Sequence, residues 1–213
     1  TAVDESGRTA KALAEKIGWE EGSKLLAEVR RLPRDNRSSR FALDANRNPV
    51  RRPALGDIPQ SLRNQATGAS HANPEKLRKL VDAEKRLIFA VSTEDELAIE
   101  ACAHVQSRAI IRYHLDHGAP LSLPTAVALR DLGSVRAWLK HDSTLVHERG
   151  AHDFPVLWFA VGGGALEIAE LLASHNIAID QESRGATALD RCASQDDVEL
   201  ADWLLEHGAD KEG

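Results

Sequence analysis

The chain has 213 residues, of which 42% are hydrophobic and 4% aromatic, and its formal net charge is −6. An apolar share of this size can form a core, and the length fits one or two compact domains or a row of about six small units. Two cysteines exclude a disulfide framework, and no apolar run approaches the roughly 18 residues that a transmembrane helix needs.

The charge is distributed unevenly along the chain. Residues 1–29 have a net charge of −2, residues 30–80 a net charge of +8 and residues 81–213 a net charge of −12. An arginine-rich segment therefore precedes an acidic body, which is a marked asymmetry.

The N-terminal residues 1–31 predict a short helical hairpin. Residues 7–26 repeat the pattern of residues 185–204 without a gap, with matches between Gly7 and Gly185, Thr9 and Thr187, and Leu26 and Leu204. The outward positions of this hairpin are Lys, Glu and Ser, which is typical of the last unit of a row rather than an internal one.

Residues 32–72 predict a connector with little regular structure, because prolines and asparagines recur through it. Its arginines, and those just before it, occur without lysine between residues 30 and 52: Arg30, Arg31, Arg34, Arg37, Arg40, Arg47, Arg51 and Arg52. Arginine favours bidentate recognition of carboxylate or phosphate. The segment could lie along the acidic face of its own chain or hold an acidic partner. Nucleic acid is disfavoured, because Phe41 is the only aromatic residue there and the acidic body repels phosphate.

Residues 73–91 predict a helix. Asn73 is a favourable N-cap, Pro74 is tolerated in a first turn, and Glu75 suits a helix N-terminus. Apolar residues then recur at helical spacing at Leu77, Leu80, Val81, Leu87, Ile88 and Val91. We expect this segment to close the N-terminal end of a row of helices.

Helix pairs are expected at about residues 95–120, 124–139, 153–180 and 185–210. The last two pairs match at a shift of 32 residues, which places Leu157 on Leu189 and Leu172 on Leu204. In the third pair we expect helices near 155–162 and 165–174. The second pair is short and irregular.

The run from Gly185 through Thr187 and Leu189, followed by a helix that ends in His207-Gly208-Ala209, resembles an ankyrin repeat. Ankyrin units are two short antiparallel helices and a turn, roughly 33 residues long. The resemblance implies an all-α, ankyrin-type helix–turn–helix solenoid of about four to six irregular units over residues 73–213. Such arrays generally bind other proteins through their turn tips and concave face. The family's usual turn histidine is Asp190 here, so we expect altered hydrogen bonding in that turn.

If the C-terminus were connected to the N-terminus, the repeat pattern would continue across the connection. From Gly185 to Gly213 and on from Thr1 to Gly7 is 35 residues, close to one repeat period. We therefore expect residues 1–31 to be the C-terminal capping repeat displaced to the front of the chain, either closing its own array or exchanged with a second copy. A lone hairpin docked elsewhere is the alternative.

Candidate catalytic chemistry is sparse. His117 aligns with His207 at a helix C-terminus, where an imidazole interacts favourably with the last carbonyls. Cys102 and Cys192 occupy matching positions and are expected to be inert core thiols. His147, Glu148, His152 and Asp153 crowd one predicted loop, but ligands seldom converge in an exposed turn. We therefore expect no catalytic residue, metal or cofactor.

These patterns predict a protein-interaction module that contacts a protein partner, with an acidic segment of it as one option. The expected contact residues are Arg37, Arg40, Arg51, Arg52, His147, His152, Asp153, Trp158 and Arg184. The alternative is a small enzyme or ligand-binding protein, in which the connector covers a pocket near Trp138, His147, His152 and Trp158. We expect no membrane contact, a cytoplasmic location with the nucleus as the alternative, and a homodimer if the cap is exchanged.

Overall fold

The computed structural model describes residues 52–162 and 165–211. The chain divides into two compact units, Thr1–Arg40 and Phe41–Gly213, and the described residues all belong to the second. The expected capping hairpin and the first half of the connector, including Arg37, Arg40 and Arg51, lie outside the described residues.

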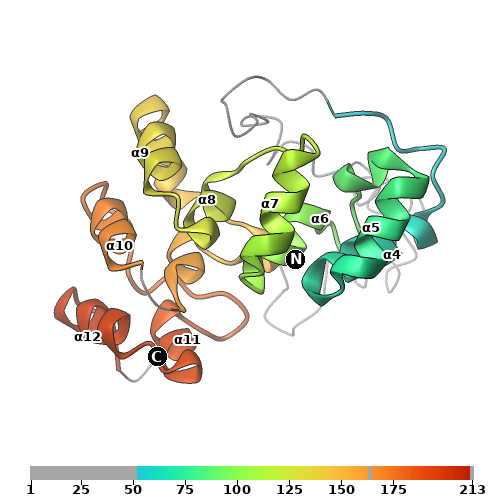
Figure 1. The fold of residues 1–213 in the computed structure, drawn as a ribbon. Helices are drawn as coiled ribbons and strands as arrows, with labels where there is room; N and C mark the ends of the chain where they lie inside the picture. Colours follow the sequence, from blue (N-terminus) through green and yellow to red (C-terminus); the bar gives the residue numbers. More distant parts are fainter. Residues whose placement is uncertain (1–51, 163–164, 212–213) are drawn as a thin grey trace, which may run out of the picture. The chain divides into compact units, whose positions relative to one another are not determined.

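The second unit is built from successive pairs of short antiparallel helices (Figure 1). The pairs are α4 (Gln60–Ala72) with α5 (Pro74–Ala83), α6 (Ala98–His104) with α7 (Arg108–Asp116), α8 (Leu123–Leu129) with α9 (Leu132–His141), the 3-10 helix η4 (Val156–Ala160) with α10 (Leu166–Ala173), and α11 (Ala188–Gln195) with α12 (Val198–Glu206). Three further 3-10 turns are η1 (Lys85–Phe89), η2 (Ser143–His147) and η3 (Ala151–Asp153). The predicted all-α helix–turn–helix solenoid is confirmed.

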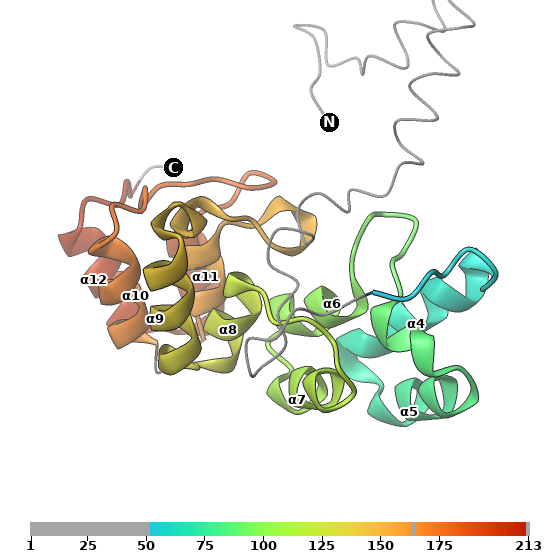
Figure 2. The same cartoon turned by 90° about the horizontal axis from the view of Figure 1, so that it is seen from above.

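The first helices of successive pairs stack on one another. Helix α6 packs between α4 and α8, and η4 packs between α8 and α11. On the second row, α10 lies between α9 and α12. Figure 2, seen from above, shows this succession of pairs from α4 to α12. We call α4, α6, α8, η4 and α11 the inner row.

One sequence prediction is wrong: the connector is not irregular as far as residue 72. Residues 60–72 form α4, which has no side-chain cap and begins after Pro59. Its small residues Ala66 and Ala69 are buried, and the helix packs against α6. Its stability therefore comes from tertiary packing, which local sequence signals do not reveal.

The helix predicted at 73–91 is shorter than its apolar stripe. It starts as expected, because the Asn73 side chain accepts a hydrogen bond of 3.0 Å from the Lys76 N–H. However, α5 ends at Ala83, and Leu87 and Ile88 are buried from the 3-10 turn η1 instead. The carboxylate of Glu84 accepts from the Arg86 N–H at 3.0 Å and caps this new turn.

A left-handed residue joins the two helices in four of the pairs. These residues are Gln106, Arg130, Gly162 and Asp196, with φ of 57°, 62°, 110° and 53°. Three of them are not glycine, although this region is costly for other residues. Arg130 offsets that cost by donating to the carbonyls of Phe159 at 3.1 Å and Val161 at 3.0 Å in the next pair.

The core runs along the inner row and its contact with the second row. Phe159, Cys102 and Cys192 are buried in it. Trp138 and Trp203 are buried, with 6% and 7% of each residue exposed. Among the described helices, none is both long and apolar enough to cross a bilayer.

Candidate functional site

Three turns on one side of the inner row are closed by isolated antiparallel bridges. The bridges join Val91 with Leu97, Arg149 with Pro155, and Ser183 with Ala186. We call residues 91–97, 149–155 and 183–186 the turn tips. The turns that precede α6 and α11 project from the same side of the helices (Figure 2). The pair α8/α9 has no such bridge in the described structure and is reached by a short link from α7.

This short link lets the turn tips on either side of α8 meet. Glu96, in the first turn tip, is only 5% exposed. The Nε2 of His152, in the second turn tip, lies 3.2 Å from Oε1 of Glu96. Ser183, in the third turn tip, donates to the His152 carbonyl at 3.2 Å and so ties the three tips together.

Two more imidazoles reach the same carboxylate from the inner row. The Nδ1 of His104, at the end of α6, lies 3.0 Å from Oε1 of Glu96. The Nε2 of His71, at the end of α4, lies 3.6 Å from Oε2. The ring of His104 packs edge-on against the other two, with centroid separations of 4.9 Å to His71 and 4.8 Å to His152. We call these four residues the His–Glu cluster.

The ring orientations in the cluster are partly fixed by outside contacts. His71 donates from Nδ1 to the Thr67 carbonyl at 3.2 Å, which leaves its Nε2 unprotonated in the neutral ring. The Nδ1 of His152 lies 3.1 Å from a guanidinium nitrogen of Arg184, so it accepts there. The Nδ1 of His104 and Oε1 of Glu96 are buried and close, yet neither makes a hydrogen bond of good geometry among the described residues.

Charge states follow from this packing. Burial opposes ionisation of Glu96, but the imidazoles of His104, His152 and His71 outweigh it and lower the pKa of the carboxyl group. Burial lowers the pKa of His152, against the opposing effect of Glu96. A carboxylate with imidazole nitrogens turned towards it is a set of groups that could hold a metal ion.

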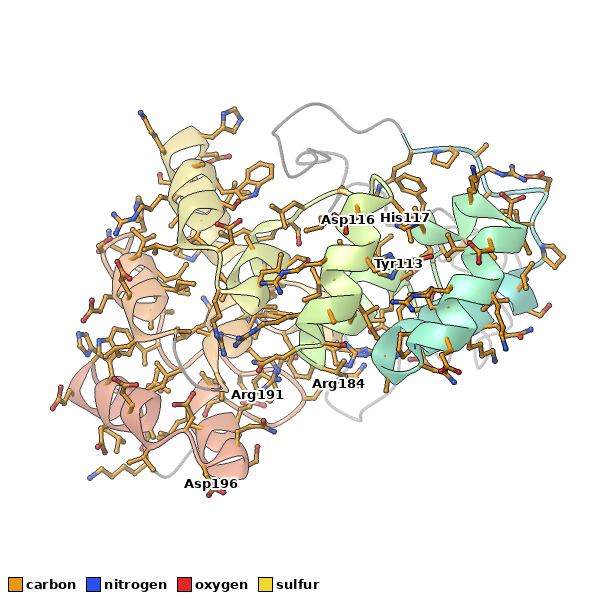
Figure 3. All side chains as sticks on the ribbon, viewed as in Figure 1. Tyr113, Asp116, His117, Arg184, Arg191 and Asp196 are labelled. Carbon is orange, nitrogen blue, oxygen red and sulfur yellow. The ribbon has the colours of Figure 1, made fainter. Side chains whose placement is uncertain are left out.

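An aromatic and basic surface lies next to the cluster. The rings of Phe154 and Trp158 stack with centroids 4.2 Å apart and planes 5° apart. Arg191, from α11, places its guanidinium carbon 4.8 Å from the Trp158 ring centroid and donates to the His104 carbonyl at 2.9 Å. Figure 3 labels Arg191 and Arg184, which come from the last helix pair and the turn tip before it.

Residues 123–212 match the family model for ankyrin repeats, in three copies. This match begins at α8 and covers the last three helix pairs, where the turn-and-two-helix order is clearest. Residues 123–212 form ankyrin repeats. A comparison with curated proteins gives no match to the chain. The pairs before α8 have the same helix–turn–helix order and stack on the ankyrin repeats, although the family match does not extend to them.

The structure separates the contact residues that were expected within one ankyrin turn. His147 is exposed at the end of η2, and Asp153 is exposed with its backbone at a φ of 67°. Glu148, between them, is half-buried, and its Oε2 atom is buried. Only His152 of this loop joins the His–Glu cluster.

The remaining described residues that were expected at a contact surface or a pocket are Arg52, Trp138, Trp158 and Arg184. Arg184 is exposed on the third turn tip, and Trp158 is half-buried beside Phe154 and Arg191. Arg52 is half-buried at the start of the described chain, and it already interacts with other residues of the protein. Trp138 is buried in α9, with its ring centroid 6.5 Å from that of His141. The ring of Phe154 lies between His152 and Trp158 and contacts both.

Of the His–Glu cluster, only His152 was among the residues predicted from the sequence. His71, Glu96 and His104 lie in three different segments, and no spacing rule for metal ligands connects them. The available signal was the pair at 124–139, which the sequence shows to be short and irregular.

Two smaller predictions about side chains are supported. His117 places Nδ1 2.8 Å from the carbonyl of Tyr113, one turn back, and so caps the C-terminus of α7 (Figure 3). His207 does the same in α12, with Nδ1 2.8 Å from the carbonyl of Trp203. Burial raises the pKa of the Cys192 thiol to about 12 and also raises the pKa of Cys102, which makes both thiols poor nucleophiles.

Proposed function

We propose that this chain binds a protein partner through the turn tips and the inner row, and that an acidic segment of the partner contacts Arg184 and Arg191 beside Trp158. Ankyrin repeats are generally protein–protein interaction modules, which is the starting point. The specific observation that supports an acidic segment is the environment of Arg191.

Arg191 is only 9% exposed, and among the described residues no carboxylate lies within ion-pair distance of it. Burial lowers its pKa to about 10, which still leaves the guanidinium charged at neutral pH. The Trp158 ring and the His104 carbonyl compensate this charge in part. A carboxylate from a partner would complete the compensation in a partly dry site, where a charge-assisted bond is strong.

Arg184 extends the same surface outwards. It is exposed on the third turn tip, and within the described part of the chain its guanidinium forms a side-chain hydrogen bond with the ring of His152. A second guanidinium at the rim favours rapid capture of an acidic chain, and Trp158 offers a rigid aromatic contact at the centre. The arginine-rich connector, with Arg37, Arg40, Arg51 and Arg52, is a further proposed contact that rests on the sequence.

The test is selection of a displayed random-peptide library on the immobilised full-length chain, followed by measurement of Kd for the enriched peptides. We expect enriched peptides to carry an excess of Asp and Glu. Arg184→Glu should weaken their binding about tenfold or more, because it turns an attraction into a repulsion.

Arg112→Glu is the matched control, because Arg112 is exposed on α7 and lies outside the turn tips. It introduces the same charge change away from the proposed surface. Enriched peptides without acidic excess, or equal weakening by both substitutions, would contradict the proposal.

A further inference from the structure

Binding of an acidic peptide does not explain why the carboxylate of Glu96 is buried among three histidines. Burying a carboxylate costs several kcal/mol unless charge and hydrogen bonds compensate it. Glu96 is buried at 5% exposure without any Lys or Arg within ion-pair distance among the described residues. Its neighbours are three imidazoles. These compensate the negative charge of the carboxylate only when a proton or a metal ion lies between an imidazole nitrogen and a carboxylate oxygen.

We propose that His71, Glu96, His104 and His152 bind one divalent transition-metal ion, with zinc as the best match. Zinc takes imidazole nitrogen and carboxylate oxygen in tetrahedral sites, and three imidazoles with one carboxylate form a complete donor set. The four ligand atoms lie within 4.8 Å of one another. Tetrahedral bonds of about 2.0 Å separate ligand atoms by roughly 3.3 Å, so only small side-chain movements are needed.

The ring of His71 is already prepared for a metal. Its Nδ1 donates to the Thr67 carbonyl at 3.2 Å, which is the outer contact that metal-binding histidines commonly make. This bond turns an unprotonated Nε2 towards Oε2 of Glu96, 3.6 Å away. In the neutral ring two lone pairs face each other at this distance, and a cation between them, either a proton or a metal ion, removes their repulsion.

His104 gives the second indication. Its Nδ1 and the Oε1 of Glu96 are 3.0 Å apart and buried, but neither forms a hydrogen bond of good geometry among the described residues. A metal ion bound by both atoms would satisfy them without requiring the ring to point at the oxygen. The side chains of His104 and His152 are each 15% exposed, and that of His71 is 33% exposed, so an ion has a path from solvent.

Arg184 opposes metal binding at His152. A guanidinium only donates, so its 3.1 Å contact requires an unprotonated Nδ1 on His152, which in a neutral ring leaves the proton on Nε2. A metal at Nε2 needs the opposite tautomer. Because Arg184 is exposed, its side chain can turn outwards when the ion enters. Arg184→Ala should therefore tighten metal binding severalfold, which a merely structural cluster would not show.

The test uses the full-length chain freed of metal with a chelator and titrated with Zn²⁺ against a chromogenic competitor. We expect one ion per chain. Glu96→Gln and His104→Ala should each weaken binding by more than about 100-fold, since each removes a direct ligand. Substitution with Co²⁺ should give the intense visible bands of four-coordinate cobalt.

His147→Ala is the matched control, because His147 is exposed on a neighbouring turn and outside the cluster. Its metal affinity should equal that of the unmodified chain. Circular dichroism separates ligand loss from unfolding, and Glu96→Gln keeps the side-chain shape. Failure of the intact chain to bind Zn²⁺, or equal affinity in Glu96→Gln and His147→Ala, would overturn the metal site and leave a proton-sharing cluster.

Discussion

The guanidinium carbon of Arg191 lies 4.8 Å from the centre of the Trp158 ring, so a cation of α11 is held against an aromatic residue of η4. This contact joins two neighbouring ankyrin repeats at their inner face. It also leaves the arginine with an aromatic ring and a backbone carbonyl as its partners, in place of a carboxylate. The proposed recognition of an acidic segment depends on this relationship.

Arg191→Lys should weaken binding of the selected acidic peptides by about fivefold to thirtyfold. Lysine keeps the charge but loses the planar fork and the stacking on Trp158, an effect worth about 1–2 kcal/mol in a partly dry site. Fluorescence anisotropy with labelled peptide measures the change. An affinity equal to that of the unmodified chain would show that the planar guanidinium is not used.

Glu148 should make the protein less stable as pH rises. Burial, and then the nearby Glu100, raise the pKa of Glu148 to about 8 from 4.5, against the opposing hydrogen bond of Leu123. Between these values the folded protein holds a proton that the unfolded chain has lost, so the free energy of unfolding falls as pH rises. Glu148→Gln should remove this slope and stabilise the protein by about 1–3 kcal/mol at pH 9.

Urea denaturation at several pH values measures this effect. Glu170→Gln provides the control, because Glu170 is exposed on α10 and should leave the slope unchanged. If the free energy of unfolding of Glu148→Gln fell with pH as steeply as that of the unmodified chain, Glu148 would have to be ionised in the folded protein.

Gly150→Ala should destabilise the array by about 1–3 kcal/mol through overpacking. A Cβ at this position would lie 2.5 Å from Cζ of Phe159 and 3.1 Å from Cβ of Pro124, in a fully packed part of the inner row. Gly68→Ala is the opposite case: nothing lies within 4 Å of its new Cβ in α4, and alanine favours helix. Thermal unfolding should give a lower Tm for the first change and an equal or higher Tm for the second.

The last ankyrin repeat should need the N-terminal hairpin. Val198, an apolar residue at the start of α12, is 67% exposed. If residues 1–31 cover this end, their deletion should lower Tm and promote aggregation, whereas deletion of residues 1–6 alone should have a small effect. Gel filtration separates closure within one chain from exchange between two. A truncated chain as stable and monomeric as the full chain would contradict the displaced-cap hypothesis.

The sequence predicted the helix pairs after residue 95 from local signals. The last two pairs match at a shift of 32 residues, and the pair at 95–120 shares its Cys and His positions with the last one. Thr187 illustrates this. Its N–H and hydroxyl donate to Asp190 at 2.7 and 2.9 Å, so aspartate replaces the usual histidine and caps α11 in a different way. Helix α4 was missed because Ala66 and Ala69 stabilise it only through contact with α6.

The His–Glu cluster could not be predicted, because its four residues come from separate segments and meet only in the folded chain. Glu96 and His152 become neighbours since the link before α8 is too short to form a turn tip between them. A rule based on spacing along the sequence does not predict contacts between such distant segments. Trp158 was identified from its residue type and its place in a first helix, whereas its partner Arg191 was not identified.

Hydrogen–deuterium exchange of the full-length chain, with and without a selected acidic peptide, tests the proposed binding surface most directly. The account predicts slower exchange in residues 149–162 and 183–195, which contain two turn tips and the Arg191–Trp158 contact. Exchange in the outer helices α9 and α10 should change little. Protection confined to α9 and α10, with none at the turn tips, would contradict the account.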